Sequence, residues 1–347
     1  MHRRQAPVGR DQRRHRLLPQ RDERRPGHGR PPRPRPGVSV PGSSPRGVRA
    51  VALGGGHGLN RSLQALALAV DHVTAVVTVA DDGGSSGRLR RDLGVLPPGD
   101  LRMALAALSP DSRLVELLQY RFDRGELDGH SLGNLLFVAL EDLHGGDAVA
   151  ALDELASFLG IRGRVLPCTT TPVWLHAEAD GGDHVAGQVA VAGTKRVEKV
   201  WLEPGDAVGT PAAVEAIAVA DLVVLGPGSL YTSLLPNLLV TAVADAVRAA
   251  TAPVVLVANL REQPGETEGM TLADHLDALE QHVPGLRLQA IVAHDGARPN
   301  GPGRSLQADL DAVADRGIEL IAADLLDGDD GHDPAALAGI LRDLVRA

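Results

Sequence analysis

The chain has 347 residues, of which 44% are hydrophobic but only 2% aromatic, so Ala, Val and Leu must fill the core. Valine-rich strands and leucine-rich helices in such a composition favour an α/β protein over a β-sandwich. The formal charge of −9 is divided unevenly, because the first 48 residues hold 13 Arg against three acidic residues and the remainder carries −19. An acidic body argues against nucleic acid as the main partner, since phosphate backbones require a basic face.

Cysteine content and hydropathy exclude further classes. Cys168 is the only cysteine, which rules out an internal disulfide and a multi-cysteine metal cluster. Its surroundings, VLPCTT, are more typical of a small core residue than of a nucleophile. No apolar run approaches the roughly 20 residues that span a bilayer, and the N-terminus lacks a secretory apolar stretch. These features predict a cytoplasmic protein without a membrane span.

The N-terminal region, residues 1–47, is rich in Arg, Pro and Gly and has almost no periodic apolar positions. Such a segment buries too little surface to offset its ordering entropy, so we predict a disordered extension. A start of translation near Val48 is the alternative. A single ligand-binding domain is expected over 48–347.

Regular structure is predicted from Val48 onward. A strand at 49–53, a glycine loop, a helix at about 59–70 and a strand at 72–80 form a unit with parallel strands and a right-handed crossover. Four helices are predicted next, near 100–109, 111–119, 131–143 and 148–158. Short alternating segments with a GGD turn then predict a small antiparallel insert at about 164–203.

Alternation of helices and strands resumes after the insert. Helices are predicted at 212–219, 237–250, 271–282, near 306–316 and at 335–346, and strands at 221–226, 252–260, 286–294 and 318–323. The whole pattern predicts a Rossmann-like, doubly wound, mostly parallel sheet with a small antiparallel β insert.

The first candidate ligand-binding loop follows the first predicted strand. It consists of Gly54, Gly55, Gly56, His57 and Gly58. Glycines let a backbone approach a phosphate, and a following helix N-terminus adds positive potential. The loop lacks both the G-x-G-x-x-G spacing and a Walker lysine. A plain tight turn is the alternative.

The second loop, DDGGSSGRLR, follows the second strand. Asp81 and Asp82 suit ribose hydroxyls or a magnesium ion. Donors for phosphate come from Gly84, Ser85, Ser86 and Arg88. A solvated turn with an Asx cap is the alternative.

Further candidates lie in LPPGDLR and GHSLGN. Pro97–Pro98 predicts a rigid loop that presents Asp100 and Arg102. His130 and Asn134 lie at a predicted helix start, where Ser131 suits an N-cap. His130 fits a ligand contact and a structural histidine equally well.

Two more polar loops follow later strands. Gly226, Gly228 and Ser229 repeat the pattern of an anion cradle, and Asn259, Gln263, Glu266 and Thr267 suit a base or sugar hydroxyls. Four polar, glycine-bearing loops after four strands are typical of a ligand lying across the carboxyl edge of an open sheet. His275 is the one other histidine predicted to face that edge.

Several strings together resemble one family: GGGHGL, VTVADDGGSSGRLR, LPPGDLR, GHSLGNLL, ADLVVLGPGSLYTSLLPNLL and NLREQPGET…DH. They are similar to the YvcK-type gluconeogenesis factors, within the larger group that includes CofD, the 2-phospho-L-lactate transferase. The resemblance runs from about Val48 to the C-terminus. Three positions depart from the pattern, with His57 in place of Thr, Met270 in place of Tyr and Gly331 in place of Arg. The lost cation at Gly331 leaves Arg298 or Arg304 as replacement candidates.

The resemblance implies a factor that binds UDP-sugars, notably UDP-N-acetylglucosamine, and is required for cell shape under gluconeogenic growth. It implies no required cofactor and no firm catalytic activity. The alternative is a CofD-like transferase that uses a nucleotide-diphosphate-linked donor, with magnesium on Asp81 or Asp82. An envelope-synthesis protein as partner, and a homo-oligomer formed through the helix at 237–250, stay open.

Overall fold

The computed structural model describes residues 47–296, 303–306, 311, 313, 316–328 and 331–346. The chain divides into two units, Met1–Pro45 and Arg46–Ala347, and the second unit is described below. The extension predicted for 1–47 therefore lies, except for Gly47, outside the described residues.

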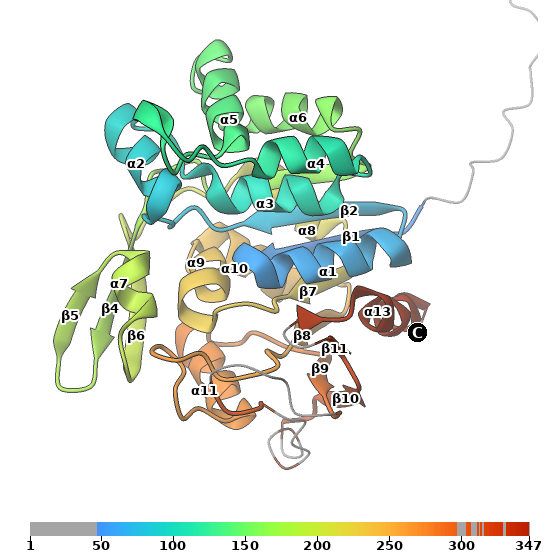
Figure 1. Ribbon diagram of the computed structural model, residues 1–347. Helices are drawn as coiled ribbons and strands as arrows, with labels where there is room; N and C mark the ends of the chain where they lie inside the picture. The colour runs from blue at the N-terminus through green and yellow to red at the C-terminus, as the bar shows by residue number, and fades with distance from the viewer. Residues whose placement is uncertain are drawn as a thin grey trace, which may run out of the picture. The chain divides into compact units, whose positions relative to one another are not determined.

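A parallel sheet of seven strands forms the centre of this unit (Figure 1). Its order is β10-β9-β8-β7-β1-β2-β3, and every neighbouring pair is parallel. The order reverses between β1 and β7, which is the switch point where doubly wound sheets bind ligands. The strands are β1 (Arg49–Gly54), β2 (His72–Val77), β3 (Gly163–Pro167), β7 (Leu222–Leu225), β8 (Val254–Val257), β9 (Ala290–His294) and β10 (Glu319–Ala323).

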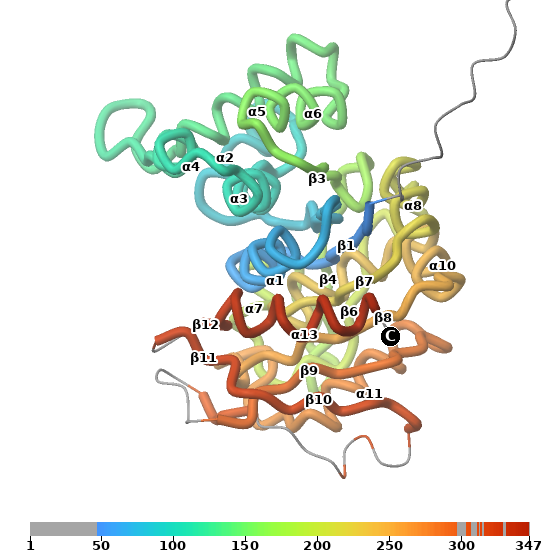
Figure 2. The backbone as a smooth tube through the Cα atoms, turned by 90° about the vertical axis from the view of Figure 1, so that its right-hand side faces the viewer, coloured from blue at the N-terminus to red at the C-terminus, as the bar shows by residue number. Residues whose placement is uncertain are grey.

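Helices cover both faces of the sheet. In Figure 2, α1 (Gly56–Ala69) and α3 (Pro98–Leu108) lie on one side, and α8 (Pro211–Ala218) and α10 (Thr241–Ala249) on the other. Helix α13 (Pro334–Arg346) packs beside α1. An outer group next to α3 and β3 consists of α4 (Ser112–Gln119), α5 (Leu132–Leu143) and α6 (Ala148–Phe158), with the short helix η1 (Gly125–Leu127) between α4 and α5. The doubly wound fold class is therefore confirmed.

Small aliphatic side chains fill the core, as the composition predicts. Ala50, Val51, Ala52 and Leu53 of β1 are at most 2% exposed. Strands covered on both faces are buried continuously rather than at alternate positions, which explains the unbroken apolar run. Cys168 belongs to this core, and burial raises the pKa of its thiol to about 12, so it stays an inert thiol.

The antiparallel insert is smaller than predicted. Gly163–Pro167 does not belong to it, because this segment pairs in parallel with β2 as the edge strand β3. The insert proper contains β4 (Trp174–Ala179), β5 (Asp183–Ala186) and β6 (Val197–Glu203). A short helix, α7 (Gln188–Ala192), replaces the second half of a predicted strand. Its Val191 is fully buried, so tertiary packing overrides β propensity there.

Two loops predicted from the sequence are helical. The segment after Asp82 forms α2 (Gly84–Leu93), and LPPGDLR begins α3 at Pro98, where a proline at the first turn is favourable. The helix predicted at 237–250 is broken after Leu238, between α9 (Leu235–Leu238) and α10, and the loop predicted before it contains a π-helix at Leu230–Leu234. The helix predicted near 306–316 falls mostly outside the described residues.

The remaining elements are α11 (Leu272–His282) and a two-stranded ribbon, β11 (Leu326–Asp327) with β12 (Gly331–His332). Among the described residues, no single helix is long and apolar enough to cross a bilayer. Only Leu230–Leu238 and Thr241–Ala249, bent by 79° at their junction, reach that length and hydropathy together.

Candidate functional site

Four glycine-bearing loops meet at the carboxyl edge of the sheet, as predicted. They follow β8, β7, β1 and β2, which are adjacent to one another in the sheet in this order. The loops after β1 and β7 touch closely, because a Cβ on Gly58 would lie 2.4 Å from the Pro227 carbonyl oxygen and one on Gly228 3.5 Å from the Gly55 oxygen. The candidate site is therefore centred on the switch point between β1 and β7.

A carboxyl group from another helix lies against the loop after β1. Asp100 of α3 accepts a hydrogen bond from the Gly56 N–H, and a Cβ on Gly55 would lie 2.5 Å from Asp100 Oδ2. Burial, reinforced by the charge of Asp81, raises the pKa of Asp100 to about 7. An acidic side chain thus covers part of the N-terminus of α1, where the sequence predicted a phosphate. His57 is exposed and lines a separate groove.

The two aspartates after β2 make structural contacts. Asp81 Oδ1 accepts from the Gly83 N–H at 2.9 Å, and burial raises its pKa. Asp82 Oδ1 accepts from the Val189 N–H of α7 at 3.0 Å, and Gly187 has no room for a Cβ beside it. Asp82 therefore holds the insert against the carboxyl edge of the sheet. Within the described ranges, no group of three or more His, Cys, Asp or Glu is arranged to hold a metal.

The N-terminus of α2 is open. Gly84 begins the helix with φ +46°, and no atom lies within 4 Å of the position of a Cβ there. The N-cap, Gly83, has no side chain that could cap the helix, and its own N–H donates to Asp81 Oδ1. The first N–H groups of a helix have no partner within the helix and attract anions. The backbone of Gly84, Ser85 and Ser86 therefore offers the cradle that the sequence predicted.

The side chain of Ser85 faces the interior instead. Its Oγ lies 3.0 Å from His130 Nδ1 and accepts from Asn134 Nδ2 at 3.0 Å. Arg102 Nε donates to Asn134 Oδ1 at 2.9 Å, and its Nη1 donates to Gln119. Burial lowers the pKa of Arg102 to about 10 and also lowers that of His130. This buried network joins α2, α3 and α5, so these side chains position the cradle.

Arg88 is directed away from the cradle as well. Its Nη2 donates to the Asp128 carbonyl oxygen at 2.6 Å and leaves no space for a Cβ on Gly129. Arg88 thus ties α2 to the turn that precedes α5.

The loop after β7 is held by an amide. Gly226 and Gly228 have φ +73° and +148°, which favours glycine at both positions. The Gly228 N–H donates to Asn259 Oδ1 at 2.8 Å, and Asn259 Nδ2 donates to the Gly228 carbonyl at 2.9 Å. Asn259 thereby fixes this loop through backbone bonds in both directions.

The next residues form a buried polar cluster. The Ser229 hydroxyl bonds to Glu266 and Thr232. Burial raises the pKa of Glu266 to about 7, and its Oε2 has no hydrogen-bond partner. Thr267 Oγ1 accepts from the Gln263 N–H at 2.8 Å, which closes the turn that carries Glu266. Of the predicted group, Ser229, Asn259 and Glu266 lie together, while Thr267 and Gln263 shape the turn.

Sequence reasoning missed several residues that support the loops. Asn237 Nδ2 donates to the Gly54 and Ser233 carbonyls, and Ser62 Oγ donates to the Gly226 carbonyl at 2.6 Å. Asn237 ends the string GPGSLYTSLLPN, so the sequence marks it as part of a motif. The sequence does not indicate that it bonds to Gly54, which lies 183 positions earlier.

The cation next to Gly331 was also missed. Arg304 is occupied by Glu262, with Nε 3.1 Å from Oε2, and Arg298 lies outside the described residues. Instead, Arg61 Nη2 would lie 2.8 Å from a Cβ on Gly331. Arg61 also pairs with Asp327 at 3.1 Å and lines an open groove of about 750 Å³ together with His57 and Gly58.

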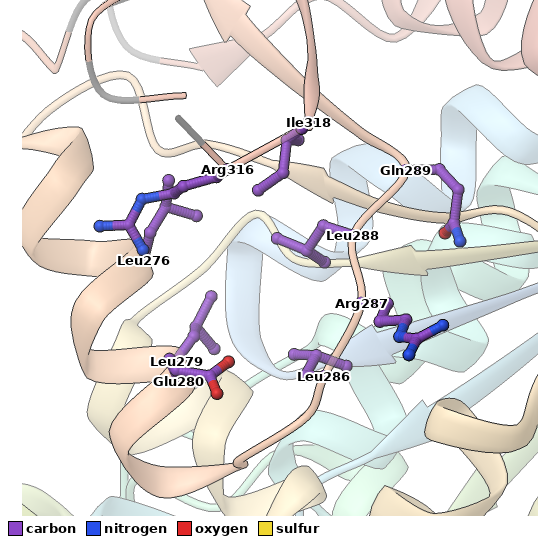
Figure 3. Close-up of a pocket in the computed structure, with 10 residues that line it drawn as sticks. Leu276, Leu279, Glu280, Leu286, Arg287, Leu288, Gln289, Arg316 and Ile318 are labelled. Carbon is purple, nitrogen blue, oxygen red and sulfur yellow. The ribbon is translucent and has the colours of Figure 1, made fainter. Parts of the chain in front are cut away.

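Another pocket, of about 630 Å³, lies away from these loops. Figure 3 shows Leu276 and Leu279 of α11 facing Leu286 and Leu288 of the segment before β9. Ile318, just before β10, also lines it, so this pocket borders the amino ends of β9 and β10. Ligands of doubly wound sheets bind at the carboxyl ends, so the glycine-bearing loops are the better candidate.

Seven parallel strands with glycine-bearing loops at a switch point define a doubly wound α/β protein. The profile of the family described as 2-phospho-L-lactate transferase CofD matches residues 50–326. A protein of Listeria monocytogenes named gluconeogenesis factor is 43% identical over 292 residues, covering 82% of this chain and 90% of the relative. Its namesake from Bacillus subtilis is 40% identical over 307 residues, covering 84% and 96%.

A solved structure agrees with these relatives. The crystal structure of a member of the UPF0052 family from Bacillus halodurans superposes with a TM-score of 0.81 at 36% identity, covering 86% of this chain and 99% of the other. The chain belongs to the CofD family, among the YvcK-type gluconeogenesis factors.

Proposed function

We propose that this protein is a regulatory factor that binds a UDP-sugar, UDP-N-acetylglucosamine in the first place, and acts in cell shape and envelope growth on gluconeogenic carbon sources. The diphosphate would lie on the N–H groups of Gly84, Ser85 and Ser86. The observation that carries this placement is the open N-terminus of α2, next to the switch point, with free space above Gly84.

The neighbouring loops supply the remaining contacts. Gly228 and Ser229, held by Asn259 and Glu266, border the base or the sugar. Arg61, beside Gly331, offers a cation at the edge of the adjoining groove. Asp100 and Thr78 crowd Gly55 of the first loop, whereas the space above Gly84 is open, so we assign the anion to α2.

A CofD-like transferase is the second candidate, favoured by the family match over residues 50–326. It would place magnesium on Asp81 or Asp82. Against it, one oxygen of each carboxylate already accepts a backbone N–H bond within the fold. An envelope-synthesis protein as partner and a homo-oligomer belong to the regulator proposal, and ligand-dependent pull-down tests the former.

Calorimetric titration separates the two candidates. The full chain is titrated with UDP-N-acetylglucosamine and with guanosine diphosphate, each with magnesium and with a chelator. Uridine-selective, metal-independent binding supports the regulator. Guanosine-selective or magnesium-dependent binding supports the transferase, and turnover of a phosphoenolpyruvate-linked nucleotide would then be assayed.

The placement of the diphosphate has a matched pair of variants. Asn and Asp both tolerate a positive φ, so Gly84→Asn and Gly84→Asp carry similar backbone costs, and space for either side chain exists. The added carboxylate should weaken binding by about tenfold or more relative to Gly84→Asn through repulsion of the diphosphate. Equal affinities for the two variants would remove α2 from the site.

A further inference from the structure

His275 of α11 is a buried histidine with one free ring nitrogen. Its side chain is 6% exposed. Nδ1 lies 2.7 Å from the Thr271 carbonyl oxygen, one turn earlier in the helix. A carbonyl only accepts hydrogen bonds, so Nδ1 carries the proton. Nε2 is buried and has no hydrogen-bond partner. In the neutral ring this atom is an acceptor with a free lone pair.

The ring borders a cavity next to the loops of the candidate site. The cavity has a volume of about 20 Å³, enough for one water-sized group, and Gly226, Gly228 and Asn259 line it together with His275. All its other lining residues except Ala258 are Leu or Val, so Asn259 and His275 are its polar side chains.

Asn259 is already engaged in this cavity. Its Oδ1 and Nδ2 both bond to the backbone of Gly228. His275 Nε2 is therefore the uncommitted acceptor at this end of the β7 and β8 loops. A buried acceptor without a partner is unfavourable unless a donor arrives, and a ligand bound at the carboxyl edge can bring one.

We infer that His275 is a specificity-determining residue that accepts a hydrogen bond from an N–H or O–H group of the bound nucleotide sugar. This inference rests on the proposed function. The donor belongs either to the uridine, as its imino N–H or a ribose hydroxyl, or to the sugar, as a hydroxyl or its amide N–H. A ligand lacking that donor would leave Nε2 buried and unpaired.

Two substitutions separate the acceptor from the rest of the ring. In His275→Gln the amide oxygen can reach the position of Nε2, so the acceptor is kept. In His275→Asn the amide nitrogen can keep the bond to the Thr271 carbonyl, but nothing reaches Nε2. We expect His275→Asn to weaken binding of UDP-N-acetylglucosamine about tenfold and His275→Gln less than about threefold.

The source of the donor follows from a second titration, with uridine diphosphate alone. If the difference between the variants persists, the donor belongs to the uridine; if it disappears, the donor belongs to the sugar. Both results support the inference. Equal affinities of the two variants for both ligands, with a lowered Tm for His275→Asn, would mean that the cavity holds only structural water, and would overturn it.

A measurement on the unsubstituted protein guards against variants that fail to fold. The ¹⁵N resonance of His275 Nε2 should lie in the range of a bare imidazole nitrogen and shift when ligand saturates the protein. An unmoved resonance in the saturated protein overturns the inference and leaves the proposed function intact. Absence of uridine-nucleotide binding by the full chain overturns the proposed function, and the inference with it.

Discussion

The loops after β1 and β7 have the same appearance in the sequence but differ in how they are held. Both are glycine-rich, follow a buried strand and precede a helical segment. In the first, the backbone N–H of Gly56 bonds to the carboxyl of Asp100. In the second, the amide of Asn259 bonds to both backbone groups of Gly228. Gly56 of the first loop is thus held by a titratable group and Gly228 of the second by a neutral one.

This difference has a consequence for ligand binding. A carboxyl whose pKa is about 7 brings partial negative charge to the first loop at neutral pH. The amide adds no charge at Gly228, but the next residue, Ser229, bonds to Glu266, whose pKa burial also raises to about 7. An anion is better placed on α2, where the space above Gly84 is open, than on the first loop, where Asp100 crowds Gly55, although the first loop carries more consecutive glycines.

The contact between the two loops should give the largest effect on stability. Gly58→Ala forces a Cβ to within 2.4 Å of the Pro227 oxygen and 2.8 Å of Gly228 Cα, both backbone atoms of the second loop. We expect a loss of about 4 kcal/mol in the free energy of unfolding, measured by urea denaturation. Gly56→Ala is the control, because only Met103 lies within reach of its Cβ, at 4.0 Å. Its φ of +63° should cost about 1–2 kcal/mol. Equal losses would mean that the loops are not in tight contact.

The titratable loop should also respond to pH. Burial raises the pKa of Asp100 from 3.8 to about 7, so between these values the folded state binds more protons than the unfolded state. Stability should therefore fall as the pH rises from about 4 to 7. Asp100→Asn removes the ionising group and should stabilise the protein at pH 8 by roughly 3 kcal/mol, with little change near pH 4.

Urea denaturation of Asp100→Asn and the unsubstituted protein across this range is the measurement. A stability difference that is the same at pH 4 and pH 8 would contradict a raised pKa for Asp100.

The neutral contact between Asn259 and Gly228 should show a smaller effect that does not depend on pH. Asn259→Ala removes both hydrogen bonds to Gly228, which should cost about 2 kcal/mol. Asn60→Ala on α1 is the matched control, because Asn60 Oδ1 has no hydrogen-bond partner, and it should change stability by less than about 0.5 kcal/mol. A pH-dependent loss for Asn259→Ala would mean that ionisation of Glu266, which bonds to Ser229, is coupled to the contact at Gly228.

Much of the frame of the fold is readable in the sequence. Strands such as VVLVANL and DLVVLG are short apolar runs that end in polar, glycine-bearing segments, and the alternation with helices predicts their parallel order. The boundary of the antiparallel insert is harder to predict from the sequence. Gly163–Pro167 reads like its neighbours within the insert, and only pairing with β2, about 90 residues earlier, assigns it to the main sheet.

In the candidate site, too, some features follow from the sequence and others only from the tertiary structure. The sequence alone determined which loops lie at the carboxyl edge, because strand polarity places the end of every parallel strand on one side. Only the tertiary structure decided which loop stays open to an anion. Asp100, 44 positions after Gly56, bonds to the first loop, while Ser85 turns inward to His130 and Asn134 and leaves the backbone of α2 free. Such contacts depend on the packing of helices distant in sequence, and burial then sets the charge of the groups they bring together.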